Sequence, residues 1–377
     1  MKTAISTAMR ATTIAIILGI LVGHATRAES QAPVARPGDK APGTPAPAPP
    51  PSPAGKPTKV QYSGQAMGTS VTIWLWTADE VAAAQGAEAV FSEMTRLDKE
   101  MTTWDPRSEV SQINTAAGDR PVKVSAETYA VIERAIDISR RSGGLFDITV
   151  GAFKGLWKFD YQDMDQTLPA LADVKQRLVL VNWKDVVLDA RQHSVFLRRK
   201  GMSITLGGIA KGYAVDKCVE LLRKRGLTNF MIQAGGDMYI AGKKGTEPWT
   251  VAIRDPRGPP GSFFAVTPIE DHSFSTSGDY ERAFVKDDVR YHHILDTRTG
   301  MPAHASRSVT IRAKDAFTAD AWSKVMFIMG PTDALALIKR EQLTDFEVVW
   351  VDDKNQVVMT DGIKATLKRL KDPTPGL

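Results

Sequence analysis

The sequence predicts an α+β protein. Helical and strand-like segments come in unequal clusters, whereas a doubly wound sheet would need regular alternation of strands and helices. Amphipathic spacing marks long helices in both halves of the chain, and short apolar runs lie between them. An α+β arrangement is therefore expected.

The first half of the folded region begins with strands and continues with two helices. Alternating segments over 60–76 predict strands, and a helix is expected from Ala78 to about Met101. Residues 102–120 are expected to form a loop. Ser125 is a preferred N-cap residue and predicts a second helix, which ends near Arg141.

The second half is richer in strands. A helix that contains Lys211 is expected to run to about Arg225, where Gly226 stops it. Gly235-Gly236 lies between two apolar runs and predicts a hairpin or tight turn. Further helices are expected over 316–329 and 332–340. The expected strands are 186–188, 195–197, 203–206, 230–233, 238–240, 249–253, 263–266 and 291–295, with a closing hairpin of 347–350 and 357–360.

The N-terminal residues 1–28 have the pattern of a secretory signal peptide. Lys2 and Arg10 give a cationic start, an apolar core covers 14–22, and Thr26-Arg27-Ala28 is an acceptable cleavage site. The apolar core is too short to span a membrane. We expect export, most simply to a bacterial periplasm, and a mature protein that is soluble or at most peripherally bound to a membrane.

Composition separates a tether from a globular domain. Residues 29–58 are rich in Pro and Ala and predict an extended, disordered spacer, whereas 59–377 have ordinary globular composition. The net charge of +5 is spread along the chain, so nucleic-acid binding is not expected. Cys218 is the only cysteine and falls on a predicted buried helix face, which excludes an internal disulfide and favours a core role.

A glycine pair followed by a lysine suggests a site for an anion. The apolar segment 202–206 runs into Gly207-Gly208, and the next helix carries Lys211 near its start. Glycines allow close approach of a ligand to the backbone, and a helix N-terminus with an added cation favours phosphate. The same pattern also occurs in ordinary strand-to-helix turns.

A series of further motifs sharpens this prediction, because together they resemble the FAD:protein FMN transferase (ApbE) family. The likeness runs from about residue 67 to residue 330. It is carried, in family order, by Met67-Gly68-Thr69, 108–114, 144–151, 206–216, Gly235-Gly236-Asp237, 275–281, 292–296, Thr299-Gly300 and 318–321.

The resemblance implies two α+β subdomains with mixed or antiparallel sheets, T-fold-like, and a nucleotide bound between them. It implies FAD as a substrate and Mg²⁺ held by Asp320 and by the main-chain carbonyl of Gly208. His293 or Asp279 would handle protons. The positions that would contact FAD are Met67, Trp104, Leu145, Phe146, Asp147, Thr205, Lys211 and Ile294.

Two positions depart from the family pattern. Lys324 stands where a metal-binding Thr or Ser is expected, and an ammonium group cannot ligate a metal. It could instead neutralise a diphosphate directly, or form a solvated ion pair with Asp320 one helical turn earlier. Thr205 replaces an acidic residue and supplies no charge. The dependence on Mg²⁺ is therefore left open.

Two other candidates have ordinary structural alternatives. His292 and His293 are adjacent in an expected strand, so only one can face a given site, and the resemblance favours His293. Asp279 ends a polar segment, 275–279, that could bind a phosphate or ribose or could simply form a turn.

The resulting hypothesis is an exported enzyme that transfers FMN from FAD to a Ser or Thr of a partner flavoprotein in an exported electron-transfer system, with release of AMP. The alternatives are a flavin-binding protein without transferase activity and a FAD pyrophosphatase that yields FMN and AMP.

Overall fold

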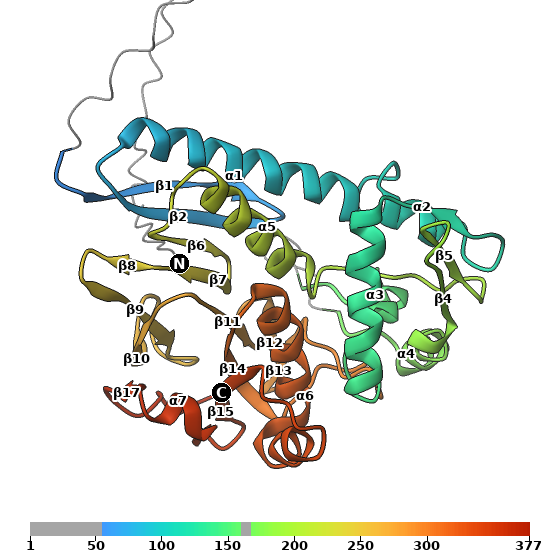
Figure 1. Ribbon diagram of the computed structural model, residues 1–377. Helices are drawn as coiled ribbons and strands as arrows, with labels where there is room; N and C mark the ends of the chain where they lie inside the picture. Colours follow the sequence, from blue (N-terminus) through green and yellow to red (C-terminus); the bar gives the residue numbers. More distant parts are fainter. Residues whose placement is uncertain (1–54, 160–166) are drawn as a thin grey trace, which may run out of the picture. The chain divides into compact units, whose positions relative to one another are not determined.

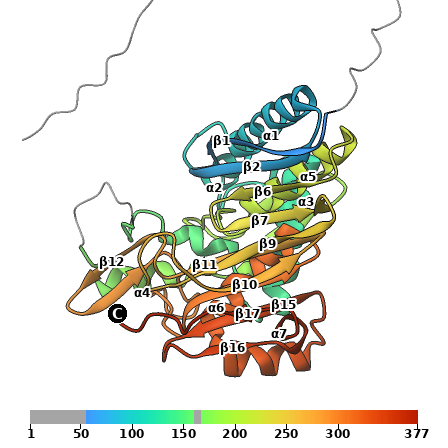
Figure 2. The same ribbon diagram turned by 90° about the vertical axis from the view of Figure 1, so that its left-hand side faces the viewer.

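The computed structural model describes residues 55–159 and 167–377, and its largest element is an antiparallel sheet of eight strands (Figures 1 and 2). The strand order is β1-β2-β6-β7-β11-β14-β15-β16. The bounds are β1 Thr58–Ala66, β2 Thr69–Thr77, β6 Phe230–Ala234, β7 Asp237–Ala241, β11 His272–Gly278, β14 Ser306–Ala313, β15 Phe346–Asp352 and β16 Val357–Met359.

Three long helices pack against this sheet: α1 (Glu80–Met101), α5 (Ala210–Lys224) and α6 (Ala316–Arg340) (Figure 1). Helix α5 lies between α1 and α6 and contacts both. Their apolar faces and the inner face of the sheet form the larger hydrophobic core. Cys218 is fully buried in this core, as predicted.

The sheet is also covered on its opposite face. Neighbouring residues of a strand point to opposite sides, so Tyr239 belongs to the helical core while Ile240 belongs to a second core. The second core is closed by a four-stranded sheet in the order β17-β10-β9-β8. Its elements are β8 Lys243–Lys244, β9 Glu247–Arg254, β10 Phe263–Ile269 and β17 Lys368–Arg369, with α7 Asp361–Lys364 nearby in the chain.

A smaller α+β part lies beside the ends of α1 and α6, on the right of Figure 1. It contains a three-stranded sheet in the order β3-β5-β4, and a separate hairpin, β12-β13, occurs later in the chain. The bounds are α2 Glu109–Thr115, β3 Val122–Lys123, α3 Ala126–Arg141, η1 Ile148–Phe153, α4 Leu171–Leu178, η2 Trp183–Asp185, β4 Val186–Asp189, β5 Ser194–Leu197, β12 Ala283–Lys286 and β13 Val289–His292. The predicted α+β class is confirmed.

Several predicted element boundaries are confirmed by their local chemistry. Ser125 Oγ accepts a hydrogen bond from Thr128 N at 3.1 Å and begins α3. Gly226, with φ of 77°, follows the end of α5. Gly330, with φ of 72°, interrupts α6 just before Pro331, so the two predicted helices are present and are separated there.

Three local predictions are wrong. The expected loop 102–120 contains α2, because Ser108 caps that helix by accepting a bond from Ser111 N. The expected strand 203–206 joins no sheet, since the Asn114 side chain bonds both Ile204 N (2.7 Å) and Ile204 O (2.9 Å). The expected strand 291–295 ends at His292, whose ring accepts a bond from Ile294 N and so competes with strand pairing.

The predicted signal peptide and residues 29–54 of the predicted tether lie outside the described residues. Strand β1 begins at Thr58, one residue before the predicted start of the globular domain. Along residues 55–159 and 167–377, no helix combines the length and apolar character needed to cross a lipid bilayer.

Candidate active site

Four charged side chains from three elements meet near the start of α5. Lys211 Nζ lies 3.0 Å from Asp237 Oδ2, at the start of β7, and 3.8 Å from Asp320 Oδ2, in α6. Lys324 forms an ion pair with Asp320 Oδ1 and donates to the Asp320 main-chain oxygen at 2.9 Å. We call Lys211, Asp237, Asp320 and Lys324 the charge cluster.

Close packing of α5 against α6 creates this cluster. A Cβ added at Gly212 would lie 2.4 Å from Ala316 O and 2.8 Å from Asp320 Cβ, so only glycine fits there. The Asp216 carboxylate accepts hydrogen bonds from Ala316 N (2.7 Å) and Phe317 N (2.9 Å) at the first turn of α6. Both contacts hold the helices at the spacing that brings Lys211 to Asp320.

The carboxylates of the cluster are buried and its ammonium groups are partly open. The Asp320 and Asp237 side chains are 0% and 4% exposed, whereas those of Lys211 and Lys324 are 24% and 20% exposed. Burial opposes the charge of each group. For Asp237, the positive charges of the two lysines outweigh burial and lower its pKa. For Lys211, the negative charges of the two carboxylates outweigh burial and raise its pKa. Burial and the neighbouring Asp237 carboxylate raise the pKa of Asp320, and its ion pairs with Lys211 and Lys324 oppose that shift. The cluster thus places two ammonium groups against two buried carboxyl groups.

His292 faces the protein interior. It is 1% exposed, its Nε2 donates to Ala303 O at 2.7 Å, and its ring lies edge-on to Phe327. Burial lowers the pKa of His292 to about 4, so the ring is neutral at pH 7. His292 is a structural residue of the core.

His293 faces the opposite way and is exposed, as expected for neighbouring strand residues. Reduced hydration, the His292 ring, and the positive charges of Lys324, Arg282 and Lys211 lower its pKa to about 3. An exposed neutral imidazole beside the charge cluster can accept a proton from a ligand. The structure thus brings the predicted proton carrier His293 near the predicted anion-binding residue Lys211.

Asp279 is engaged elsewhere. Both of its carboxylate oxygens accept hydrogen bonds from Arg257, at 2.7 Å each, and both side chains are 9% exposed. A bidentate buried pair occupies the oxygens that would have to accept a proton. This geometry argues against the predicted proton-transfer role of Asp279 and indicates a structural role instead.

The loop 144–151 supports the glycine turn from one side. Leu145 and Phe146 are buried, and Phe146 lies beside Gly208, 3.5 Å from the position of an added Cβ. The Asp147 carboxylate accepts bonds from Thr149 N (2.8 Å) and from Trp183 N (2.8 Å). Asp147 therefore holds the loop in shape, and the direct FAD contact predicted for it remains a prediction.

The remaining predicted FAD contacts come from four separate segments of the chain. Thr205 Oγ1 accepts a bond from Gly207 N at 3.3 Å and so shapes the glycine turn. Met67 occupies the tight turn between β1 and β2 with φ of 52°. Trp104 is 80% exposed and lies 4.3 Å from the Lys154 ammonium, which leaves an aromatic face open to solvent. Ile294 is buried.

Sequence reasoning missed two residues of this region. Asp237 is the last residue of the quoted motif Gly235-Gly236-Asp237 but was given no role in the site, and its position at the start of a strand was the available signal. Arg282 follows the quoted segment 275–281. Its guanidinium lies 3.5 Å from Gly68 O, and its charge acts on both His293 and Lys211.

The residues present do not match a Mg²⁺ site. In residues 55–159 and 167–377, no three His, Cys, Asp or Glu side chains are grouped so that they could hold a metal. Asp320 is already bonded to Lys324 and to Gly212 N, the latter at 3.0 Å. Ser323, the nearest hydroxyl on α6, donates to Asp320 O and bonds Ser277 Oγ, each at 2.7 Å.

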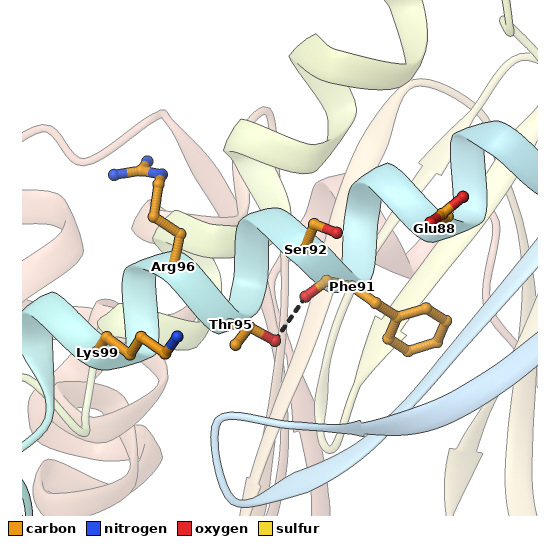
Figure 3. A pocket seen from close by; sticks show the side chains of 6 residues that line it. All are labelled: Glu88, Phe91, Ser92, Thr95, Arg96 and Lys99. Atoms are coloured by element: carbon orange, nitrogen blue, oxygen red, sulfur yellow. Dashed lines mark hydrogen bonds between the residues drawn. The ribbon is translucent and has the colours of Figure 1, made fainter. Parts of the chain in front are cut away.

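A surface depression along α1 has a different character (Figure 3). Thr95 Oγ1 bonds the helix backbone at Phe91 O (2.8 Å), and Arg96 is paired with Glu93. The depression is lined by Glu88, Phe91, Ser92, Thr95, Arg96 and Lys99. None of these belongs to the charge cluster or to the predicted site, and the depression is a solvated helix face.

The fold groups this chain with solved ApbE proteins. The flavin transferase ApbE from Vibrio cholerae matches with a TM-score of 0.71 and 25% identity, over 82% of this chain and 99% of that one. The ApbE protein from Thermotoga maritima matches with a TM-score of 0.75 and 34% identity, over the same shares. A relative from Klebsiella pneumoniae named FAD:protein FMN transferase is 31% identical over 79% of this chain and 91% of its own length. The ApbE family model matches residues 67–350, and the chain belongs to the ApbE family.

Proposed function

We propose that this protein transfers FMN from FAD to a hydroxyl group of an acceptor protein. The proposal rests on the charge cluster at the start of α5, with the exposed His293 beside it, in a chain of the ApbE family. Lys211 would bind the diphosphate of FAD, and the adjacent Gly207-Gly208 turn would let it approach the backbone.

The reaction requires one bond to form and one to break. The acceptor Ser or Thr oxygen attacks the phosphorus on the FMN side of the diphosphate, and the bond from that phosphorus to the AMP phosphate oxygen breaks. The products are a phosphoester of FMN and free AMP. Such a transfer depends mainly on alignment of the reactants and on neutralisation of phosphate charge. Lys211, Lys324 and Arg282 would supply the positive charge for that neutralisation.

His293 would accept the hydroxyl proton. Its pKa is low in the ligand-free protein partly because the positive charges of Lys324, Arg282 and Lys211 act on it. A bound diphosphate would offset those positive charges and raise the pKa of His293, which makes the imidazole a better base when the substrate is present.

A labelling assay tests this function. The full chain is incubated with FAD and a peptide that contains the acceptor motif of the family, in EDTA and separately with added Mg²⁺. We expect covalent flavin fluorescence on the peptide, a mass increase equal to one FMN moiety, and AMP in equal amount. Absence of labelled peptide under both conditions would exclude the transferase.

The two alternatives predict different products from the same assay. Free FMN and AMP without labelled peptide would indicate hydrolysis of FAD by water. Bound FAD without any product would indicate a flavin-binding protein, a possibility raised by Thr205 and Lys324 at positions where the family pattern differs.

We also propose that the chain is exported to a periplasm and acts on a flavoprotein of an exported electron-transfer system. The support is the signal-peptide pattern of residues 1–28 and the Pro/Ala-rich segment that follows. Cell fractionation with N-terminal sequencing of the mature chain tests it, and an uncleaved cytoplasmic protein would contradict it.

A further inference from the structure

We propose that the Lys324 ammonium is a built-in cation beside Asp320, at the position where a divalent ion would have to bind, and that this chain therefore holds a diphosphate without a metal ion. The consequence for catalysis rests on the proposed function, whereas the statement about metal binding is tested independently of it.

Every oxygen of Asp320 already has a donor. Lys324 pairs with Oδ1 and bonds the main-chain oxygen at 2.9 Å, while Gly212 N donates to Oδ2 at 3.0 Å. Ser323 also donates to the main-chain oxygen, and Lys211 lies 3.8 Å from Oδ2. A Mg²⁺ ion needs about six oxygen ligands in near-octahedral geometry. It would have to displace Lys324 from this fully buried carboxylate before Asp320 could become a ligand.

The charge balance gives the same result. Lys211 and Lys324 pair with Asp237 and Asp320, so a divalent ion would bring two positive charges next to two ammonium groups that already occupy these carboxylates. An anionic diphosphate has the opposite effect. It would meet the partly exposed ammonium groups of Lys211 and Lys324, whose other sides are held by buried carboxylates.

Mn²⁺ titration of the purified full chain, followed by electron paramagnetic resonance of free Mn²⁺, is the direct test. We expect no saturable binding to the wild type. Lys324→Thr removes the ammonium and supplies a hydroxyl, and it should bind Mn²⁺ at least about tenfold more tightly than the wild type. Adding Asp320→Asn to Lys324→Thr should abolish this binding. Lys339→Thr, an exposed lysine of the same helix, is the matched control and should behave as wild type. Saturable Mn²⁺ binding by the wild type would overturn the inference.

FAD binding measured without metal shows whether the positive charge of Lys324 itself contributes to diphosphate binding, separately from its effect on metal binding. By calorimetry in EDTA, the wild type should bind FAD, and Lys324→Gln should bind it about tenfold more weakly without gaining Mn²⁺ affinity. Melting curves of all variants show whether each is folded, and the wild-type titration decides the question even if a variant is not.

If the wild type labels the acceptor peptide only with added Mg²⁺, the inference is wrong and the transferase stands. If no labelling occurs under any condition, the transferase is wrong, and the Mn²⁺ titration still decides the role of Lys324.

Discussion

The backbone amide of Gly212 donates a hydrogen bond to Asp320 Oδ2 at 3.0 Å, which ties the first turn of α5 to the second turn of α6. The missing side chain of Gly212 makes this contact possible. The same contact fixes one oxygen of Asp320 while the other pairs with Lys324. The charge cluster thus depends on a glycine whose role is to let two helices approach.

Gly212→Ala should therefore destabilise the protein. The added Cβ would lie 2.4 Å from Ala316 O, a backbone atom that cannot move without the whole helix, and such overpacking costs about 1–3 kcal/mol. In an uncrowded helix, Gly→Ala would stabilise the protein by about 1 kcal/mol. A loss of stability would therefore show that the crowding at Gly212 outweighs the gain in helix propensity. Urea unfolding measures it. Gly207→Ala is the control, because its Cβ would make only an ordinary contact with Thr205 Oγ1 at 3.5 Å. Equal stability of the two variants would contradict the packing argument.

Arg282→Ala should weaken FAD binding by about tenfold, or about 1.4 kcal/mol, because one of the cations near the diphosphate site is lost. It should also raise the pKa of His293, since the Arg282 charge helps to lower it. Calorimetry measures the affinity, and an NMR titration of the imidazole measures the pKa. Arg254→Ala removes an arginine paired with Glu281 and should change neither quantity. An unchanged pKa of His293 would show that Arg282 lies too far from the site to act on it.

The sequence allowed much of this arrangement to be predicted, and the limits have physical causes. Lys211 could be named from the glycine pair and helix start that precede it, whereas Asp320 and His293 could be named because the motifs around them resemble those of the ApbE family. The pairing of Asp279 with Arg257 could not, since the two residues come from different segments and nothing local marks them as partners. The Asn114 bonds that replace strand pairing at Ile204 span 90 positions and are equally invisible to local patterns.

The buried His292 should make the fold sensitive to acid. Its pKa falls from 6.5 to about 4, so the neutral ring contributes stability above pH 6.5 that is lost as the pH falls through 4. The shift corresponds to about 3 kcal/mol. The unfolding free energy of the wild type should therefore drop more between pH 7.5 and pH 4, a range of about 3.5 units that contains that shift, than that of His292→Gln, whose side chain does not titrate. Parallel curves for the wild type and His292→Gln would show that His292 does not titrate with folding.

His293→Gln and Asp279→Asn separate catalysis from structure. His293→Gln removes the proposed base from an exposed position, so labelling of the acceptor peptide should slow by about 10²- to 10⁴-fold while the unfolding free energy and FAD affinity stay close to those of the wild type. Asp279→Asn breaks a buried bidentate pair and leaves the Arg257 charge without its partner, which should cost about 3–5 kcal/mol of stability. Single-turnover labelling and urea unfolding of both variants provide the four measurements. If Asp279→Asn were as stable as the wild type but inactive, and His293→Gln remained active, the proton would pass through Asp279 and the assignment made here would be reversed.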